Sequence, residues 1–205
     1  MASGVGLFGK TQFRKDFLSV GLPRPLVTTW ETWATRGLAR SRERIGAGWM
    51  PLYLIMPIWH AALGRSLCGV ATALSVMPSM DGAGRCFPLA VMAWSDEPDA
   101  GVAFDGGLAW ADAAEAFLLD TLDEAGSHEA VLDALAHLPP FPAAASGEAA
   151  AVDPGGSLWW TRGGEHRSPS TVAAVGMPDE DTWSAKIGDD AAPVSPDEED
   201  QRHVG

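Results

Sequence analysis

The first eleven residues contain a pattern that nucleotide-binding proteins use to hold phosphate. Residues 4–11 read GVGLFGKT, which fits both the P-loop pattern GxxxxGK[ST] and the weaker GxGxxG pattern. A P-loop needs a buried strand before it and a helix after it, so that backbone N–H groups and the helix dipole meet the phosphate. Only three residues precede Gly4, and Leu7 and Phe8 are typical of a strand that packs into a core. We therefore expect no nucleotide site here.

The histidines and cysteines form no recognisable catalytic or metal-binding pattern. The histidines are scattered along the chain and do not give the spacing of a helical zinc site; they are His60, His128, His137, His166 and His203. His60 is expected to be a hydrogen-bonded core residue rather than a catalytic base. Cys68 and Cys86 are expected to be buried, reduced thiols roughly 30 Å apart, and no GxSxG elbow surrounds a serine. The sequence predicts no catalytic residue, no cofactor and no metal site, and hence a protein that is not an enzyme.

Most charged residues are expected to be solvated or to stabilise helix ends. The carboxylates of one predicted helix spread around it instead of converging on a cation, and these are Asp112, Glu115, Asp120, Asp123 and Glu124. Residues 179–181 are expected to begin the last helix, where acidic groups meet the positive end of its dipole. The basic residues Arg36, Arg40, Arg42 and Arg44 similarly suit the end of the first helix, with a recognition patch as the alternative.

The turn at residues 78–85 is the strongest candidate for a contact surface. Asp81 and Arg85 flank two glycines at a spacing that allows them to pair, and Ser79 and Met80 offer a hydroxyl and a flexible apolar group. Two interpretations stand side by side. The tip either contacts a partner, or it is a hairpin turn fixed by its own ion pair.

Aromatic residues supply a second candidate contact region. Trp59 and the pair Trp159 and Trp160 are expected to form an exposed region that could supply the contact surface instead of the turn, because aromatic residues and arginine dominate the energetics of protein interfaces. The full set of candidate partner-binding residues is Trp59, Ser79, Met80, Asp81, Arg85, Trp159 and Trp160.

Composition limits the classes of partner. The 205 residues carry a formal net charge of −13, and the charge is divided: residues 1–95 hold ten Lys and Arg against four Asp and Glu, the remainder four against twenty-three. Such an acidic chain repels phosphate backbones, which argues against nucleic acid. The apolar run at residues 67–77 is shorter than the ~18 to 20 residues that cross a bilayer, and no signal peptide is apparent. We expect a cytoplasmic protein without membrane insertion.

Hydrophobic periodicity predicts an α/β fold. A strand is expected at residues 5–8 and a helix from Pro25 to Gly46, with two tryptophans on one stripe. A short strand follows at 57–61, where the leading proline favours a strand start or a sheet edge. Residues 70–77 and 87–94 form two longer strands joined as a hairpin, and neither face of the first is polar, so both faces are expected to be covered.

The second half of the chain predicts two helices, two strands and a final helix. One helix carries a stripe from Trp110 to Thr121, and a second runs to Leu138, where prolines follow. Residues 143–156 read as a loop or linker, 158–161 and 171–175 as strands, and 180–187 as a short helix. The expected domain spans residues 1–188, and residues 189–205 form an acidic, disordered tail.

The order of short motifs resembles one known family, TagF (also called ImpM), accessory proteins of bacterial type VI secretion. The matching pieces are GLFGK at 6–10, DF at 16–17 with GLP at 21–23, Trp30 and Trp33, Pro57 with Trp59, MPS at 77–79 leading into Asp81, GR at 84–85 with FPL at 87–89, and SLWW at 157–160. Each motif is weak alone, and their order makes the resemblance specific.

The resemblance implies a single three-layer α/β sandwich, with a mixed, largely antiparallel sheet and helices on both faces. It also implies a posttranslational negative regulator of type VI secretion assembly that binds the forkhead-associated scaffold protein of the apparatus. A threonine kinase and a phosphatase belong to the same circuit and would be indirect partners. The alternatives are a structural accessory subunit of the apparatus and a P-loop nucleotide-binding protein.

Overall fold

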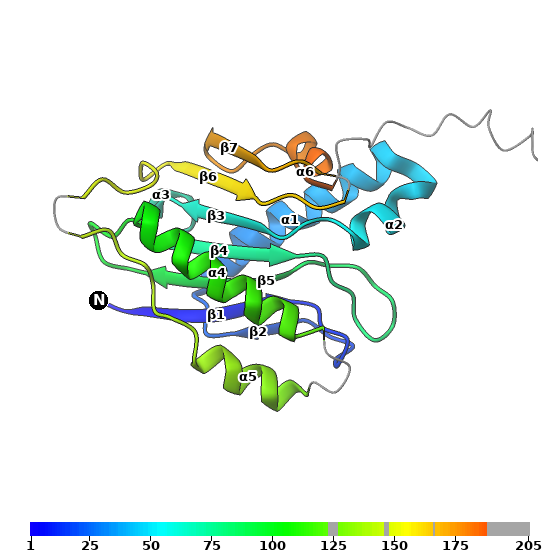
Figure 1. The fold of residues 1–205 in the computed structure, drawn as a ribbon, viewed down its shortest axis with the longest axis horizontal. Coiled ribbons are helices and arrows are strands. Elements are labelled where there is room, and N and C mark those ends of the chain that lie inside the picture. The colour runs from blue at the N-terminus through cyan, green and yellow to red at the C-terminus, as the bar shows by residue number, and fades with distance from the viewer. Residues whose placement is uncertain (123–126, 146–147, 166, 188–205) are drawn as a thin grey trace, which may run out of the picture.

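The computed structural model describes residues 1–122, 127–145, 148–165 and 167–187, which form an α/β fold around one seven-stranded sheet (Figure 1). The strands are β1 (Ser3–Gly9), β2 (Leu18–Val20), β3 (Trp59–Leu63), β4 (Ala71–Met77), β5 (Leu89–Ser95), β6 (Gly156–Thr161) and β7 (Ser170–Val175). The helices are α1 (Arg24–Ile45), the 3-10 turn η1 (Gly46–Gly48), α2 (Trp49–Leu54), α3 (Arg65–Cys68), α4 (Phe104–Asp120), α5 (His128–Ala136) and α6 (Glu180–Ile187). The predicted tail at 189–205 lies outside the described residues.

The strands follow the order β2-β1-β5-β4-β3-β6-β7, and every pairing between these described strands is antiparallel. The sheet is therefore antiparallel rather than mixed. The predicted hairpin is confirmed, because Ala71 pairs with Ser95 at one end of β4 and Met77 with Leu89 at the other. The strand behind Pro57 is not an edge, since β3 lies between β4 and β6. All seven residues of β4 are buried, as expected for a strand covered on both faces.

One face of the sheet, which we call the α1 face, packs against α1 and α6 through tryptophans. Trp30 and Trp33 are buried on the predicted stripe, and the Trp33 ring centroid lies 4.8 Å from those of both Trp159 and Trp183. Trp183, on α6, sits over Gly37, where a Cβ atom would lie 2.6 Å from the indole. Gly37 therefore lets α6 approach α1 closely, and the aromatic rings close this side of the core.

The other face, which we call the α4 face, packs against α4 and α5 (Figure 1). Its core is rich in alanine, which lets helix and sheet approach closely; the alanines include Ala62, Ala71, Ala73, Ala93 and Ala114. The predicted stripe from Trp110 is buried, and Ser127 caps α5 by accepting a hydrogen bond from the N–H of Ala130 at 3.1 Å. The helix α5 ends at Ala136, two residues before the predicted end at Leu138.

The remaining connections agree with the predicted turns, and three short elements were not predicted. In the described parts of 143–156, Ala143 and Ala150 form isolated bridges to residues at the start of α4, so this loop packs on the domain. The short elements β2, α2 and α3 have three, six and four residues, too few for a periodic pattern to develop.

Candidate partner-binding surface

The P-loop-like segment is built into the sheet. Residues 3–9 form β1, which pairs with β2 on one side and β5 on the other. The glycines serve close packing, since a Cβ on Gly6 would lie 2.4 Å from the Val20 carbonyl oxygen, and one on Gly9 2.2 Å from that of Pro88. The backbone of this segment is thus committed to sheet hydrogen bonds and close contacts. It forms no phosphate-binding loop.

Lys10, the lysine of that pattern, is buried against the turn at residues 78–85. Asp81 Oδ2 accepts hydrogen bonds from Lys10 Nζ at 2.9 Å and from Arg85 Nε at 2.7 Å. Asp81 Oδ1 accepts from the backbone N–H groups of Ala83 and Arg85 at 3.0 and 2.9 Å. Burial opposes ionisation of Asp81, but these donors outweigh it and hold the pKa of Asp81 well below its usual range. The carboxylate is therefore charged and fully bonded.

A tyrosine fixes the other side of the turn. The Tyr53 hydroxyl donates to the Ser79 carbonyl oxygen at 2.9 Å and accepts from the Ser79 N–H at 3.0 Å. The Ser79 hydroxyl donates to the Lys10 carbonyl oxygen at 2.7 Å. The turn is therefore rigid, and the pairing of Asp81 with Arg85 is confirmed as a structural ion pair.

The structure places few of the predicted contact residues at the surface. Four of them are buried, namely Trp59, Ser79, Asp81 and Trp159, while Met80 and Trp160 are half-buried and Arg85 is exposed. The expected exposure of Trp59 and Trp159 is wrong. Both strands that carry them are interior strands of the sheet, and the Trp159 indole packs against Trp33 on the α1 face.

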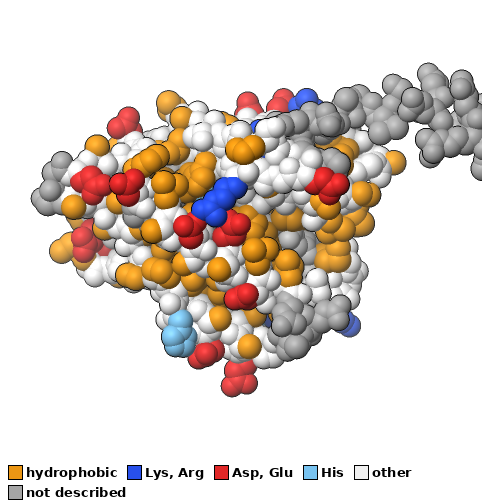
Figure 2. Space-filling model, in the orientation of Figure 1, with side chains coloured by type: hydrophobic (Ala, Val, Ile, Leu, Met, Phe, Trp, Pro, Cys, Tyr) orange, Lys and Arg blue, Asp and Glu red, His pale blue; other side chains and the backbone are white. Residues whose placement is uncertain are grey.

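An apolar groove lies beside the turn, and we call it the α2–α4 groove. It encloses about 460 Å³ between the ends of α2 and α4, and Met80 and Pro78 form part of its wall. Its rim consists of four aliphatic side chains that keep 42 to 49% of their surface exposed: Leu54, Ile55, Leu119 and Leu122. Figure 2 shows hydrophobic side chains gathered over this end of the molecule. Contiguous exposed apolar surface of this kind marks interaction sites.

Sequence reasoning missed this groove, although part of the signal was visible. Leu119, in the last turn of α4, and Leu122, just beyond its end, are exposed, whereas Phe117, Leu118 and the C-cap Thr121 are buried. Apolar residues outside a core stripe indicate a second contact face. Leu54 and Ile55 gave no such signal, because α2 was not predicted.

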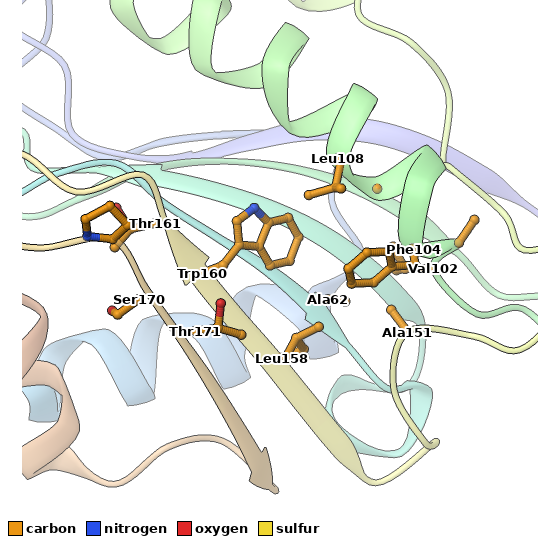
Figure 3. Close-up of a pocket in the computed structure, with 13 residues that line it drawn as sticks. Ala62, Val102, Phe104, Leu108, Ala151, Leu158, Trp160, Thr161, Ser170 and Thr171 are labelled. Atoms are coloured by element: carbon orange, nitrogen blue, oxygen red, sulfur yellow. The ribbon is translucent and has the colours of Figure 1, made fainter.

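A second apolar cavity, of about 400 Å³, lies between the start of α4 and strands β6 and β7 (Figure 3). The side chains of Trp160, Phe104 and Leu108 line it, and the hydroxyls of Ser170 and Thr171 lie at its polar side. Trp160 is thus the member of the predicted tryptophan pair that faces a cavity. Trp159, one residue away, points to the opposite face of the sheet, as strand geometry requires.

His60 lies in a buried polar bridge between the sheet and α4. Its Nδ1 is 2.8 Å from Ser75 Oγ on β4, and its Nε2 is 3.2 Å from Glu115 Oε2 on α4. Arg162 lies beside Glu115 at 3.6 Å and also pairs with Asp112. Burial, together with the Arg162 charge and against the attraction of Glu115, lowers the pKa of His60.

The order serine, histidine, glutamate matches that of a hydrolytic triad, but in the described part of the chain neither of the two cavities described above reaches the serine or the histidine. Ser75 and His60 are buried, and neither lines the α2–α4 groove nor the second cavity. The prediction that His60 is a hydrogen-bonded core residue is confirmed. The expectation that Glu115 belongs to a solvated helix face is wrong, because its side chain reaches the sheet.

The cysteines and the acidic residues at the start of the last helix have structural roles. The two thiols are free and buried, and burial raises the pKa of both Cys68 and Cys86. Asp179 caps α6 by accepting from the N–H of Thr182 at 2.7 Å, as predicted.

The described residues contain no group of three or more His, Cys, Asp or Glu side chains arranged to hold a metal ion. Within the same residues, no helix combines the length and hydrophobicity needed to span a bilayer.

Comparison with known proteins identifies the family. A family model described as the TagF N-terminal domain, type VI secretion system-associated, matches residues 6–138. The chain belongs to the TagF family. The TagF match covers β1 through α5, and the sheet is completed by β6 and β7 beyond it. The resemblance predicted from ordered motifs is confirmed, and with it an association with type VI secretion.

A solved structure extends the similarity over nearly the whole chain. The protein PA0076 from Pseudomonas aeruginosa PAO1, known from a crystal structure at 2.05 Å resolution, is 32% identical in sequence and superimposes with a TM-score of 0.80. The alignment covers 94% of this TagF chain and 97% of PA0076. A comparison with curated proteins found no match.

Proposed function

We propose that this TagF chain is a cytoplasmic, non-enzymatic regulator that represses type VI secretion assembly after translation by binding the forkhead-associated scaffold protein of the apparatus. The α2–α4 groove carries the proposal, because it is an exposed apolar surface on a protein of a secretion-associated family. A threonine kinase and a phosphatase of the same circuit are indirect partners in this proposal. Nucleic acid, membrane and cofactors have no part in the activity.

The groove suits a protein partner on energetic grounds. Its four rim side chains are large and aliphatic, and removing apolar surface from water contributes roughly 25 cal/mol per Å². The neighbouring turn is held in place, since Lys10 and Tyr53 bond to it from outside and its own residues Asp81 and Arg85 pair with each other. A preformed surface loses little conformational entropy on binding, so more of the contact energy appears as affinity.

Among the predicted contact residues, Ser79 and Met80 line the groove, and Arg85 is the exposed residue of the turn next to it. Its side chain is 60% exposed, while Asp81, its ion-pair partner, is fully buried. The guanidinium is therefore held at the surface by a fixed carboxylate. Arginine anchors of this kind are enriched among the residues that dominate binding energy.

The test uses the purified chain and the purified scaffold protein. Wild-type chain is expected to co-elute with the scaffold, and Leu54→Ser combined with Leu119→Ser is expected to abolish co-elution while leaving the melting temperature nearly unchanged. Phe104→Ser is the control, because Phe104 is also a large exposed apolar residue but lines the second cavity instead. Retained co-elution in the groove variant would place the scaffold contact elsewhere and refute the assignment.

Deleting the gene separates the proposed repressor from a structural accessory subunit of the apparatus. A repressor's loss raises secretion, whereas a required component's loss abolishes it. The P-loop alternative makes a different prediction, a magnesium-dependent rise in melting temperature with ATP or GTP, because a ligand of the folded state stabilises it. We expect increased secretion and no such rise.

A further inference from the structure

The two edges of the sheet differ in how they are protected. At one edge, β2 has only three residues, and short edge strands are a common means of preventing edge-to-edge association. At the other edge, β7 has six residues, reading STVAAV, with no charge and no proline. Among the described residues no strand pairs with the outer side of β7. This edge lacks the usual devices that block strand addition.

The side chains of β7 on the α4 face are also open. Thr171, Ala173 and Val175 are exposed there, and Val175 keeps 98% of its surface accessible. They lie across from Trp160, Leu158 and Gly156 in the β6 register, beside the second cavity. Both the backbone edge and this part of the sheet surface are therefore accessible together.

We propose that β7 pairs with β7 of a second copy of this chain, joining two sheets into one across a two-fold axis. A two-fold axis perpendicular to the sheet makes the two strands antiparallel, as every neighbouring pair in the sheet already is. It also keeps each exposed side chain on the same face as its counterpart. The outward backbone groups of both copies gain hydrogen-bond partners, as in β-strand addition.

Charge favours a second copy as the occupant. The strand itself has no charge, so like charges do not meet when identical strands pair. Glu165 and Arg167 precede β7 and Asp179 follows it, and antiparallel pairing brings Arg167 of one copy, whose guanidinium lies over its own Trp59 ring, toward Asp179 of the other. The chain's own tail is a poor alternative, because residues 189–205 contain six carboxylates and two prolines, which strands disfavour.

The expected dimer is weak. Six residues from each copy bury less than the ~1,200 Å² that specific, stable interfaces need, and each copy has a net charge of −13. Association is therefore expected to depend on protein concentration and to strengthen as salt screens the repulsion. The surface is separate from the proposed scaffold contact, because β7 contributes no residue to the α2–α4 groove.

The experiment is analytical ultracentrifugation of the full chain across a wide micromolar range. Wild type is expected to shift from monomer to dimer, while Ala173→Glu and Ala173→Lys each remain monomeric because like charges then face each other. An equimolar mixture of the two variants is expected to dimerise again, through opposite charges at the same position. Ala47→Glu, at an exposed alanine in η1, is the matched control and should dimerise as wild type does.

Three results would overturn the proposal. A wild-type chain that stays monomeric at every concentration has no self-association to explain. An Ala173→Glu variant that dimerises like wild type locates the interface elsewhere. A mixture of the Glu and Lys variants that stays monomeric shows that the two side chains do not meet. Circular dichroism of each variant verifies that the substitutions leave the fold intact.

Discussion

The two faces of the sheet are closed in different ways. On the α1 face, four tryptophans from α1, β6 and α6 pack ring against ring, with centroid separations of 4.8 to 6.5 Å. On the α4 face, alanines line the contact, and a cavity of about 400 Å³ remains where α4 does not cover β6 and β7. Large rings fix one face, and the second face retains apolar surface that can still be buried.

The buried charged and polar groups also differ between the two faces. Asp81 lies at the end of the sheet near Phe87 and Tyr53 of the α1 face, and its carboxylate accepts four hydrogen bonds. His60 on the α4 face has Ser75 on one side and Glu115, which is partly exposed, on the other. From this comparison we expect substitutions of the tryptophans on the α1 face to cost more stability than substitutions beside the second cavity on the α4 face.

The largest expected effect separates two adjacent tryptophans. Trp159→Ala removes a fully buried indole from the α1 face and is expected to lower the free energy of unfolding by about 4 kcal/mol. Trp160→Ala, on the half-buried cavity side, is expected to cost less than half as much. Urea denaturation of the two variants measures both values. Equal losses of unfolding free energy in the two variants would contradict the view that the α1 face is the more tightly packed of the two.

Removing Asp81 tests the buried network of the α1 face. Asp81→Ala leaves Lys10 buried without its counter-charge and is expected to lower the free energy of unfolding by about 3 kcal/mol. Arg85→Ala, at the exposed end of the same network, is expected to cost at most about 1 kcal/mol. Thermal melts at neutral pH compare them. A small loss for Asp81→Ala would contradict the structural role of the buried Lys10–Asp81 pair.

The same carboxylate has a defined pH window. Because the folded-state pKa of Asp81 lies below that of the unfolded chain, its stabilisation is present above pH ~3.9 and is lost as pH falls below that value. Asp81→Asn is expected to lack this acid-dependent loss. Unfolding free energies measured between neutral and strongly acidic pH give the difference between the two proteins.

His60 provides a milder pH dependence on the α4 face. Its folded-state pKa is lowered, so the unfolded chain binds the proton more readily and stability falls as pH drops below ~6.5. One such group contributes a slope of at most about 1.4 kcal/mol per pH unit. His60→Gln is expected to flatten the slope between pH 7 and 5, whereas His137→Gln, at an exposed position, is the control. A slope that survives in His60→Gln would assign it to other groups.

The smallest effect is expected at the open part of the α4 face. Leu108→Ser changes a partly exposed side chain at the rim of the second cavity and is expected to alter the free energy of unfolding by about 0.5 kcal/mol or less. Denaturation in urea provides the value. A loss of unfolding free energy as large as that of Trp159→Ala would mean that the side chains around the second cavity contribute to stability as much as the α1 face does.

The sequence predicts elements whose periodicity is long enough to be seen, which covers most of the fold. The helix α1 was predicted from the spacing of Leu26, Trp30 and Trp33, and the hairpin of β4 and β5 from two apolar runs around a glycine-rich turn. The helix α2 was not, because its six residues are nearly all apolar and include Pro51.

The candidate site was predicted less well, because its decisive contacts join residues that are distant in the chain. Lys10 and Asp81 are 71 residues apart, so their pairing could not be inferred from local spacing, although the pairing of Asp81 with Arg85 could. Trp59 and Trp159 were expected at the surface, since a single sequence does not show which strands lie inside a sheet. The α2–α4 groove forms only when the ends of two separate helices meet.

The close contact of Trp183 with Gly37 affects the order in which the core can form during synthesis. Trp183 packs on Gly37, and Trp159 packs on Trp33 from the sheet side. Trp159 and Trp183 both lie beyond the segment matched by the family model, which ends at residue 138. On a growing chain, Trp30 and Trp33 therefore lack these two covering rings until residues 159 and 183 have been synthesised.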